Sequence, residues 1–368
     1  MNRASLGLII TVSLLFAIGL LMVFNTTAAE IIDRSLNVST HSALLRQISY
    51  GMVGLIVGTL VYFYGYRTIL KQSLPLLIVT TLLLLLVFVP TVGQTINGAR
   101  RWIGFAGYTF QPSECAKILI PLCFIRWTLA QTEQITFRSF VKVLFLLLIP
   151  IVLILLEPDN GTTVIIFASL TILFMLARIR WLYWVMPLCL LAVMGVLAAS
   201  RMPHVPDRIR IYLHPELDLK GKGHQPHQAK IAAGSGQIFG RGLGESLQKL
   251  NYLPEARSDY IAAIFAEECG FVGIVGLIAL YMTFAYAGFI VALSAPDRAG
   301  FLIASFLTFL IAFQAFLNLG IVSGLLPSKG MTLPFFSQGG SSLIMNIIAL
   351  FLLLDISRAS NKNVSVTR

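Results

Sequence analysis

The sequence predicts an all-α, polytopic integral membrane protein with about ten transmembrane helices. The mean hydropathy is +0.84 and only 12% of the 368 residues are charged, too few charges to cover a soluble protein of this length. Apolar runs recur, each close to the roughly 20 residues that cross a bilayer core of about 30 Å. The runs are continuous rather than alternating, which favours helices over the strands of a barrel.

The predicted spans are separated by short polar breaks along the whole chain. They fall near residues 6–25, 48–64, 75–92, 112–129, 140–156, 162–178, 182–200, 263–293, 299–322 and 340–356. We interpret the first span as an anchor rather than a signal peptide, because it lacks a convincing small-residue cleavage site. We find no repeat and no separate soluble domain, so residues 1–368 are expected to form one transmembrane domain.

Lysine and arginine in the short loops predict the orientation, because cytoplasmic loops carry an excess of them. One side receives Arg3, Arg67, Lys71, Arg126, Arg138, Lys142, Arg178, Arg180, Arg298, Arg358 and Lys362. That side is predicted to be cytoplasmic, with both termini on it. The outer side receives longer segments rich in Gly and Pro, the largest being an extracytoplasmic loop over residues 201–262. The net charge of +11 is scattered among loops, so no nucleic-acid partner is expected.

The segment QPSECAK (111–117) opens the fourth span and brings two opposite charges to membrane depth. Glu114 and Lys117 are three residues apart, so they share one face of a helix. Charges within a span cost roughly 2.5–3.5 kcal/mol each on insertion scales, and therefore pair with each other or face an aqueous cavity. The spacing leaves an ion pair and a functional cavity equally open.

Two aspartates stand directly before apolar runs. In EPDNGTT (157–163), Asp159 can cap the following helix or project into the same cavity as Lys117. In YLPEARSDYI (252–261), the apolar run restarts after Tyr260, which places Asp259 at a helix N-terminus. The helix dipole favours a carboxylate there, so spacing alone favours a capping role for both aspartates.

Two Gly-rich segments lie on the predicted outer side. GSGQIFGRGLG (234–244) matches neither a dinucleotide fingerprint nor a Walker A loop. We interpret it as a turn between two re-entrant or surface helices, with Arg241 and Lys249 making it electropositive. LLPSKGMTLPFFSQGGSS (325–342) indicates a broken helix or structured loop of the kind that lines ligand cavities, and Lys329 is its only charge.

The cysteines and histidines favour no metal or disulfide site. The cysteines lie in or beside apolar segments and are expected to be small buried hydrophobes; they are Cys115, Cys123, Cys189 and Cys269. His224 and His227 have no further ligands clustered nearby, so we place them in a solvated loop.

Four motifs together resemble the SEDS family (shape, elongation, division and sporulation), polytopic glycosyltransferases that polymerise peptidoglycan. They are GARRWIGFAGYTFQPSECAK, EPDNGT, GRGLGESLQKLNYLPEARSDYIAAIFAEECGFVG and NLGIVSGLLPSKGMTLPFFSQGGSSL, in this order over essentially the whole chain. The wording of GESLQKLNYLPEA and LPSKGMTLP resembles the division branch, FtsW, more than the elongation branch, RodA. Three positions depart from the family pattern: Gln338 replaces a Tyr, Asn160 an apolar residue and Ser258 a Thr. None of the three is a charged site residue, so we expect altered substrate contacts only near Gln338.

The resemblance implies a site at the outer face of the bacterial cytoplasmic membrane. Asp259 corresponds to the family's essential aspartate, and Glu114, Lys117 and Asp159 to its polar cavity residues. The remaining predicted substrate contacts are Arg46, Arg100, Arg101, Arg241, Lys249, Lys329, Ser337, Gly339, Gly340 and Ser341.

The implied substrate is lipid II, a lipid-linked disaccharide whose leaving group is polyprenyl diphosphate. Asp259 is the candidate base for the acceptor hydroxyl. One carboxylate can suffice, because a diphosphate leaves as an anion, whereas a glycosidase needs a second carboxyl as acid. Cations must face the developing negative charge. No cofactor is clearly implied, but a divalent cation (Mg or Mn) could share that task.

Two other functions stay open from the sequence. A lipid II flippase or transporter also suits broken helices, but it needs polarity through to the cytoplasmic half, whereas the unusual residues gather outside. A non-catalytic scaffold would leave Asp259 as only a helix cap. The resemblance also implies a partner, a class B penicillin-binding protein acting as transpeptidase, within the divisome or the elongasome.

Overall fold

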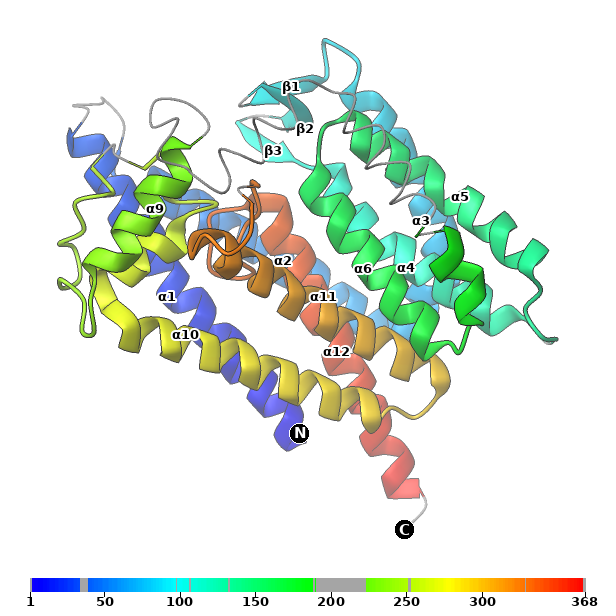
Figure 1. Cartoon of the computed structure of the whole chain (residues 1–368). Coiled ribbons are helices and arrows are strands. Elements are labelled where there is room, and N and C mark those ends of the chain that lie inside the picture. The colour runs from blue at the N-terminus through cyan, green and yellow to red at the C-terminus, as the bar shows by residue number, and fades with distance from the viewer. Residues whose placement is uncertain are drawn as a thin grey trace.

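The computed structural model describes residues 2–33, 39–96, 98–105, 107–131, 133–187, 189, 223–250, 253–327 and 329–366. Within these residues, seven helices are long and apolar enough to cross a membrane. They are α1 (Arg3–Asp33), α2 (Ser42–Tyr64), α3 (Tyr66–Val87), α5 (Phe137–Leu156), α10 (Ile261–Leu293), α11 (Arg298–Val322) and α12 (Gly340–Val366). The shorter α4 (Pro112–Ala130) and α6 (Asn160–Leu176) run in the same bundle (Figure 1). The predicted multi-pass helical architecture is confirmed, while the predicted span 182–200 lies mostly outside the described residues.

Helices α4, α11 and α12 form the centre of the bundle. About two thirds of the residues of α11 and α12 are buried, whereas only about a third or fewer are buried in α2, α3 and α5. Nearly every residue of α4 from Pro112 to Ile125 is buried, including Glu114 and Lys117. A central helix can carry these charges because protein groups, rather than lipid, surround them.

Small residues let α2 pack closely against α12. A Cβ added at Gly54 would lie 2.8 Å from the Ile347 side chain, and one at Gly58 would lie 2.5 Å from Phe351. Helices associate in lipid through close packing of this kind, because lipid tails are as apolar as the helix surfaces and the hydrophobic effect does not drive them together.

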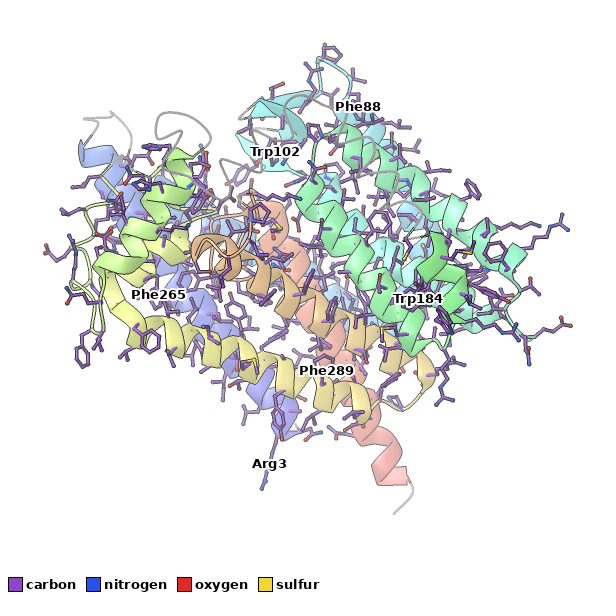
Figure 2. The ribbon with its side chains drawn as sticks, in the orientation of Figure 1. Arg3, Phe88, Trp102, Trp184, Phe265 and Phe289 are labelled. Carbon is purple, nitrogen blue, oxygen red and sulfur yellow. The ribbon has the colours of Figure 1, made fainter. Side chains whose placement is uncertain are left out.

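The loop between α3 and α4 forms a small sheet, which the sequence analysis did not predict. Strands β1 (Gly93–Ile96), β2 (Ala99–Phe105) and β3 (Tyr108–Phe110) pair antiparallel in the order β1-β2-β3. Gly98 and Gly107 stand at the two turns with φ of 77° and 82°, a backbone conformation that glycine adopts at little cost. Figure 1 shows the sheet at the end of the bundle opposite both termini, and we call this end the sheet end. Figure 2 likewise shows Arg3 projecting at the end away from Trp102 of β2.

The Gly-rich segment folds onto the first part of α10. It follows α9 (His224–Ser235), a helix whose first turn contains both histidines, so their placement in a solvated loop was wrong. A Cβ at Gly240 would lie 2.0 Å from the Glu268 carbonyl oxygen. Gly270, with φ of 66°, kinks α10 at the same point. The segment is therefore a set of turns that follows the short helix α9, as predicted, and packs onto the kinked start of α10; among the described residues no second surface helix comes before α10.

Buried charges hold this segment in place. Lys249 Nζ lies 2.9 Å from Glu268 Oε1 and donates to Asn25 Oδ1 of α1 at 2.8 Å. Glu267 accepts from Ser246 Oγ at 2.6 Å and from two backbone N–H groups, those of Leu247 and Gln248. We call Asn25, Lys249, Glu267 and Glu268 the loop clamp.

Candidate active site at the sheet end of the bundle

Asp159 lies at the start of α6 and has two sets of partners. Its Oδ1 accepts from the backbone N–H of Thr162 at 3.2 Å, so the predicted helix cap is confirmed. Its Oδ2 accepts from Ser113 Oγ and Gln111 Nε2 of the α4 start, both at 3.0 Å. The aspartate therefore caps one helix and ties it to another.

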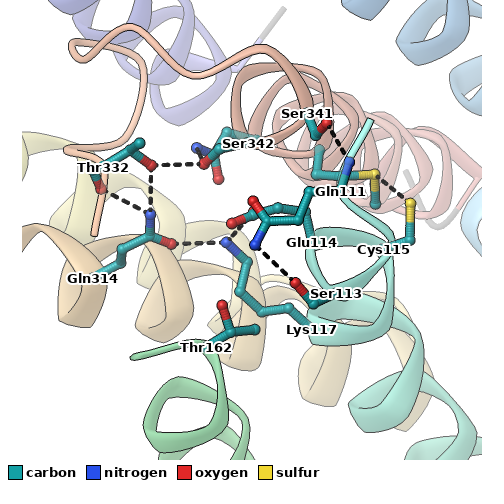
Figure 3. Close-up of polar contacts among 12 residues, drawn as sticks. Gln111, Ser113, Glu114, Cys115, Lys117, Thr162, Gln314, Thr332, Ser341 and Ser342 are labelled. Atoms are coloured by element: carbon teal, nitrogen blue, oxygen red, sulfur yellow. Dashed lines mark hydrogen bonds and ion pairs between the residues drawn. The ribbon is translucent and has the colours of Figure 1, made fainter. Parts of the chain in front are cut away.

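Glu114 and Lys117 form the predicted ion pair, with Lys117 Nζ 2.6 Å from Glu114 Oε2. Lys117 also donates to Gln314 Oε1 of α11 at 2.8 Å, as Figure 3 shows. The chain of contacts continues from Gln314 to Thr332 and Ser342. The ion pair is thus one part of a network joining α4, α11 and the loop before α12.

Asp259 does not cap α10, so the interpretation that spacing favoured was wrong. The N-cap is Tyr260, which makes no side-chain capping hydrogen bond. The Asp259 carboxylate instead lies against Gly330, where a Cβ would stand 2.8 Å from Oδ2. Within the part of the chain that the structure describes, no group donates a hydrogen bond to this carboxylate, which is partly accessible.

The surroundings of Asp259 favour its protonated form. Burial, and then the negative charge of Glu255, raises the pKa of Asp259 to about 7, with Asp159 acting in the same direction and Arg101 against it. Loss of water disfavours the ionised form of a carboxyl group that accepts no hydrogen bonds from protein groups. Asp259 can therefore exchange a proton near neutral pH.

Arg101 links the sheet to the start of α6. It donates through Nε to the Glu157 carbonyl at 2.9 Å and through Nη2 to the Pro158 carbonyl at 2.7 Å. Its Nη1 lies 3.9 Å from Asp159 Oδ1. The neighbouring Arg100 points to the other face of β2, as strand alternation requires, and contacts the Phe88 carbonyl at 3.4 Å. We call Arg101, Glu114, Lys117, Asp159 and Asp259 the aspartate site.

The loop before α12 closes the aspartate site on one side. Gly161 of α6 lies against Met331, since a Cβ there would stand 2.9 Å from Met331 Cγ. Met331 follows Gly330, the residue in contact with Asp259. Residues 330–331 therefore stand between the two aspartates, and Lys329 is partly exposed beside them.

The other predicted contact residues take different places. Ser337 accepts from the Leu333 N–H at 2.8 Å within the loop, and Ser341 accepts from the Gln111 N–H at 2.8 Å. Gly339 and Gly340 pack beside Thr332 and Tyr50. Arg46 is exposed on α2, and Arg241 lies 3.7 Å from Glu267 Oε1. Lys249 belongs to the loop clamp, where its ammonium holds Glu268 and Asn25. Its predicted contact with substrate stays a prediction.

Several residues of the site were missed from the sequence. Gln314 is uncharged and lies within an apolar helical run, where nothing marks it as a ligand. Gln111 (the N-cap of α4), Ser113 and Asn318 were quoted only as parts of motifs and were given no role in the site. Glu157 was quoted only as part of a motif. It is 1% exposed, and neither carboxylate oxygen has a hydrogen-bond partner among the described residues. Burial, and then Asp159, raises the pKa of Glu157 to about 8, so it is mainly neutral at pH 7.

Metal donors are not grouped at the aspartate site among the described residues. Over the residues that the structure describes, no three His, Cys, Asp or Glu side chains are grouped to hold a metal ion. A cavity of about 430 Å³ lies at the far end of α6, lined by Met175, Leu176, Arg178, Arg298 and Phe301. It lies about 25 Å along α6 from Asp159, so it is no part of the aspartate site.

Comparison with known sequences identifies the family. A family profile described as "Cell cycle protein", covering FtsW, RodA and SpoVE, matches residues 5–362. The probable peptidoglycan glycosyltransferase FtsW of Nitrosomonas europaea is 39% identical over 355 residues, which cover 95% of this chain and 91% of the relative. Stage V sporulation protein E of Bacillus subtilis is 36% identical over 356 residues, with 96% of each chain covered.

Solved structures agree over nearly the whole chain. A structure described as "Structural coordination of polymerization and crosslinking by a peptidoglycan synthase complex" matches with a TM-score of 0.78 at 28% identity, covering 96% of this chain and 97% of that one. The rod shape determining protein RodA of Thermus thermophilus matches with a TM-score of 0.68 at 27% identity, covering 96% of both. This chain therefore belongs to the SEDS family of FtsW, RodA and SpoVE proteins.

Proposed function

We propose that the chain is a peptidoglycan glycosyltransferase that polymerises lipid II into β-1,4 glycan strands. The observation that carries the proposal is the state of Asp259, a partly accessible carboxylate with a pKa of about 7 that caps no helix. The names of relatives that match nearly the whole chain support the same activity.

In the proposed reaction, Asp259 removes the proton of the acceptor hydroxyl. The freed oxygen attacks the anomeric carbon of the donor sugar, and the bond from that carbon to the diphosphate oxygen breaks. Polyprenyl diphosphate leaves with the bonding electrons, and a single displacement converts an α-linked donor into a β-linked glycan. A base with a pKa near the working pH combines the correct protonation state with the largest driving force for this transfer.

Cations on the same side of the bundle can stabilise the leaving group. Arg101 and Lys117 belong to the aspartate site, and Lys329 is partly exposed in the adjoining loop. Fixed positive groups in a site sheltered from water stabilise developing negative charge more than they would in solution.

The distribution of buried charge argues against a flippase. Among the described residues, the buried acidic and basic side chains are Glu114, Lys117, Glu157, Asp159, Lys249, Glu267, Glu268 and Asp355. All except Asp355 belong to, or directly adjoin, the aspartate site or the loop clamp at the sheet end. A transporter would need polar groups along a path through the bundle, whereas this arrangement suits chemistry at one face.

We further propose that the sheet end faces outward, that both termini are cytoplasmic, and that the chain works in cell division with a class B penicillin-binding protein. Loop charges support the orientation, and FtsW-named relatives support the division role. The match to a peptidoglycan synthase complex supports a partner that cross-links.

Asp259→Asn tests the activity. We expect this variant, purified in detergent and given lipid II and a partner, to form no glycan chains, since an amide cannot take the proton. The control is Asp297→Asn, away from the aspartate site: asparagine keeps the cap of α11 through the Gly300 N–H and loses only the charge that is paired with the exposed Arg67 at 2.8 Å, so near wild-type glycan synthesis is expected. Normal glycan synthesis by folded Asp259→Asn would refute the catalytic role. Movement of lipid II across liposomes by the purified protein would revive the flippase.

A further inference from the structure

Two amide side chains on α11 lie one helical turn apart beside the aspartate site. Gln314 is 2% exposed and Asn318 is 1% exposed. Residues four apart share a helix face. A buried amide costs free energy unless its donors and acceptors are used, so the partners of this pair show what it does.

Gln314 uses both ends of its amide. Its Oε1 accepts from Lys117 Nζ at 2.8 Å, and its Nε2 donates to the Thr332 carbonyl at 2.9 Å (Figure 3). An ammonium only donates and a carbonyl only accepts, so these partners fix which way the amide points. Gln314 thus sets the distance between Lys117 and the loop before α12.

Asn318 uses its amide nitrogen twice. Nδ2 donates to the Asp259 carbonyl at 2.9 Å and to the Met331 carbonyl at 2.6 Å. Its Oδ1 is buried and has no partner among the described residues. An unsatisfied buried acceptor costs about 1–3 kcal/mol, which leucine would avoid. An asparagine at this position is therefore explained by the two bonds that its nitrogen donates, or by a substrate group that donates to Oδ1.

The two amides bracket the loop that lies against the base. Asn318 holds the backbone of Asp259 beside that of Met331, and the intervening contact places Gly330 against the Asp259 carboxylate. One turn earlier, Gln314 holds Thr332 and Lys117. A single rigid helix therefore carries the connections to the base and to a cation.

We infer that Gln314 and Asn318 are positioning residues, which fix Asp259 relative to Lys117 and keep residues 330–332 packed over the base. The inference rests on the proposed function and extends it. Neither residue needs to touch the reacting atoms. Their effect is on where the base and the cation stand, and on how much water reaches Asp259.

Two substitutions at Asn318, to leucine and to aspartate, test this inference. They affect the same two hydrogen bonds but are expected to shift the pKa of Asp259 in opposite directions. Both keep the number and branching of the side-chain heavy atoms of asparagine, and both remove the two donated bonds. We expect each to lower the polymerisation rate at pH 8 by about 10- to 100-fold, as a displacement near 1 Å does elsewhere. Glu255, Asp159 and Arg101, the charges that act on Asp259, are unchanged in both variants.

The pH profile separates positioning from general damage. In Asn318→Leu, added water at Asp259 lowers its pKa, so the acid limb moves below the wild-type midpoint near pH 7. In Asn318→Asp, a second carboxylate beside Asp259 moves the limb above that midpoint. Equal losses with the limb unmoved in both variants would overturn the inference, because simple destabilisation predicts that result.

Gln314→Met and Gln314→Glu separate the two contacts of the other amide. Methionine removes both contacts, whereas glutamate keeps an acceptor for Lys117 and loses the donor to Thr332. We expect Gln314→Met to raise the KM for lipid II about tenfold, with Gln314→Glu recovering most of that change. A wild-type KM in both variants would exclude Gln314 from positioning Lys117.

Thr308→Val is the matched control on the same helix. Thr308 is fully buried, and its hydroxyl has no partner among the residues described, so valine removes no contact. We expect wild-type rate and pH profile. Asp259→Asn is assayed in parallel: an active Asp259→Asn refutes the proposed function itself. An inactive Asp259→Asn beside a wild-type Asn318→Leu refutes only the positioning.

Discussion

The aspartate site and the loop clamp are two charged clusters at the same end of one bundle, yet their carboxylates have different surroundings. Glu267 and Glu268 in the clamp are 1% exposed and receive several donors each. Asp259, two residues before the same helix, is partly accessible and receives none from the described residues. The clamp carboxylates hold structure together through the hydrogen bonds that they accept, whereas the raised pKa of Asp259 lets it exchange a proton near neutral pH. A buried carboxylate that receives no hydrogen bonds is therefore a better candidate for a general base than one that receives several.

The largest expected effect comes from breaking the clamp. Lys249→Met leaves Glu268 buried without its cation, and loss of one partner of a buried pair costs about 3–5 kcal/mol. We expect a marked drop in the free energy of unfolding and in the yield of folded protein, measured by denaturant titration and size-exclusion chromatography.

The double variant Lys249→Met, Glu268→Leu should recover most of that loss, because an apolar pair of similar volume can replace a buried ion pair. If Lys249→Met instead folds normally and only raises the KM for lipid II, Lys249 contacts substrate as the sequence analysis predicted. That result would remove the distinction between the two clusters.

Breaking the aspartate site should cost activity rather than folding. Arg101→Met removes a partly exposed cation that contacts Glu157, Pro158 and Asp159. We expect kcat/KM to fall about 10²- to 10³-fold, typical of losing one group that stabilises developing charge. Arg101→Lys should recover part of it, since lysine keeps the charge but not the fork of donors.

Arg100→Met is the comparison for Arg101→Met. Arg100 is the next residue, of the same type, on the opposite face of β2. We expect a loss below about tenfold, as for an exposed cation that acts through its field alone. A loss as large as that of Arg101→Met would place both arginines on the substrate and contradict the geometry of the strand.

Sequence reasoning was strongest where the signal was apolar or charged. The long apolar runs predicted the spans, and the i, i+3 spacing of Glu114 and Lys117 predicted their ion pair, because both follow from helix geometry. It was weakest where tertiary contacts decide. Nothing local shows that Asp159 caps its helix while Asp259 does not, since both precede apolar runs.

The missed features have the same origin. The strands of the sheet are too short to give a periodic signal. The uncharged amides Gln314 and Asn318 matter only because α11 brings them to residues about 200 and 60 positions away. Long-range pairings of this kind are set by packing and leave no trace in local spacing.

The smallest expected effect is that of Asp259→Asn on the free energy of unfolding. It distinguishes a carboxylate whose ionised form destabilises the fold from one that stabilises the fold as a helix cap. The folded pKa of Asp259 is raised to about 7, above an ordinary value near 4. The folded state therefore binds this proton more tightly, and its stability falls as pH rises from about 4 through 7. Asparagine carries no such penalty. We expect Asp259→Asn to be more stable than wild type at pH 8 by about 1–3 kcal/mol, allowing for partial exposure, and about equal at pH 4. Thermal unfolding in detergent at the two pH values measures the difference. A variant less stable than wild type at pH 8 would mean that the carboxylate supports the fold, like those of the clamp, and is not held in a strained, ionisable state.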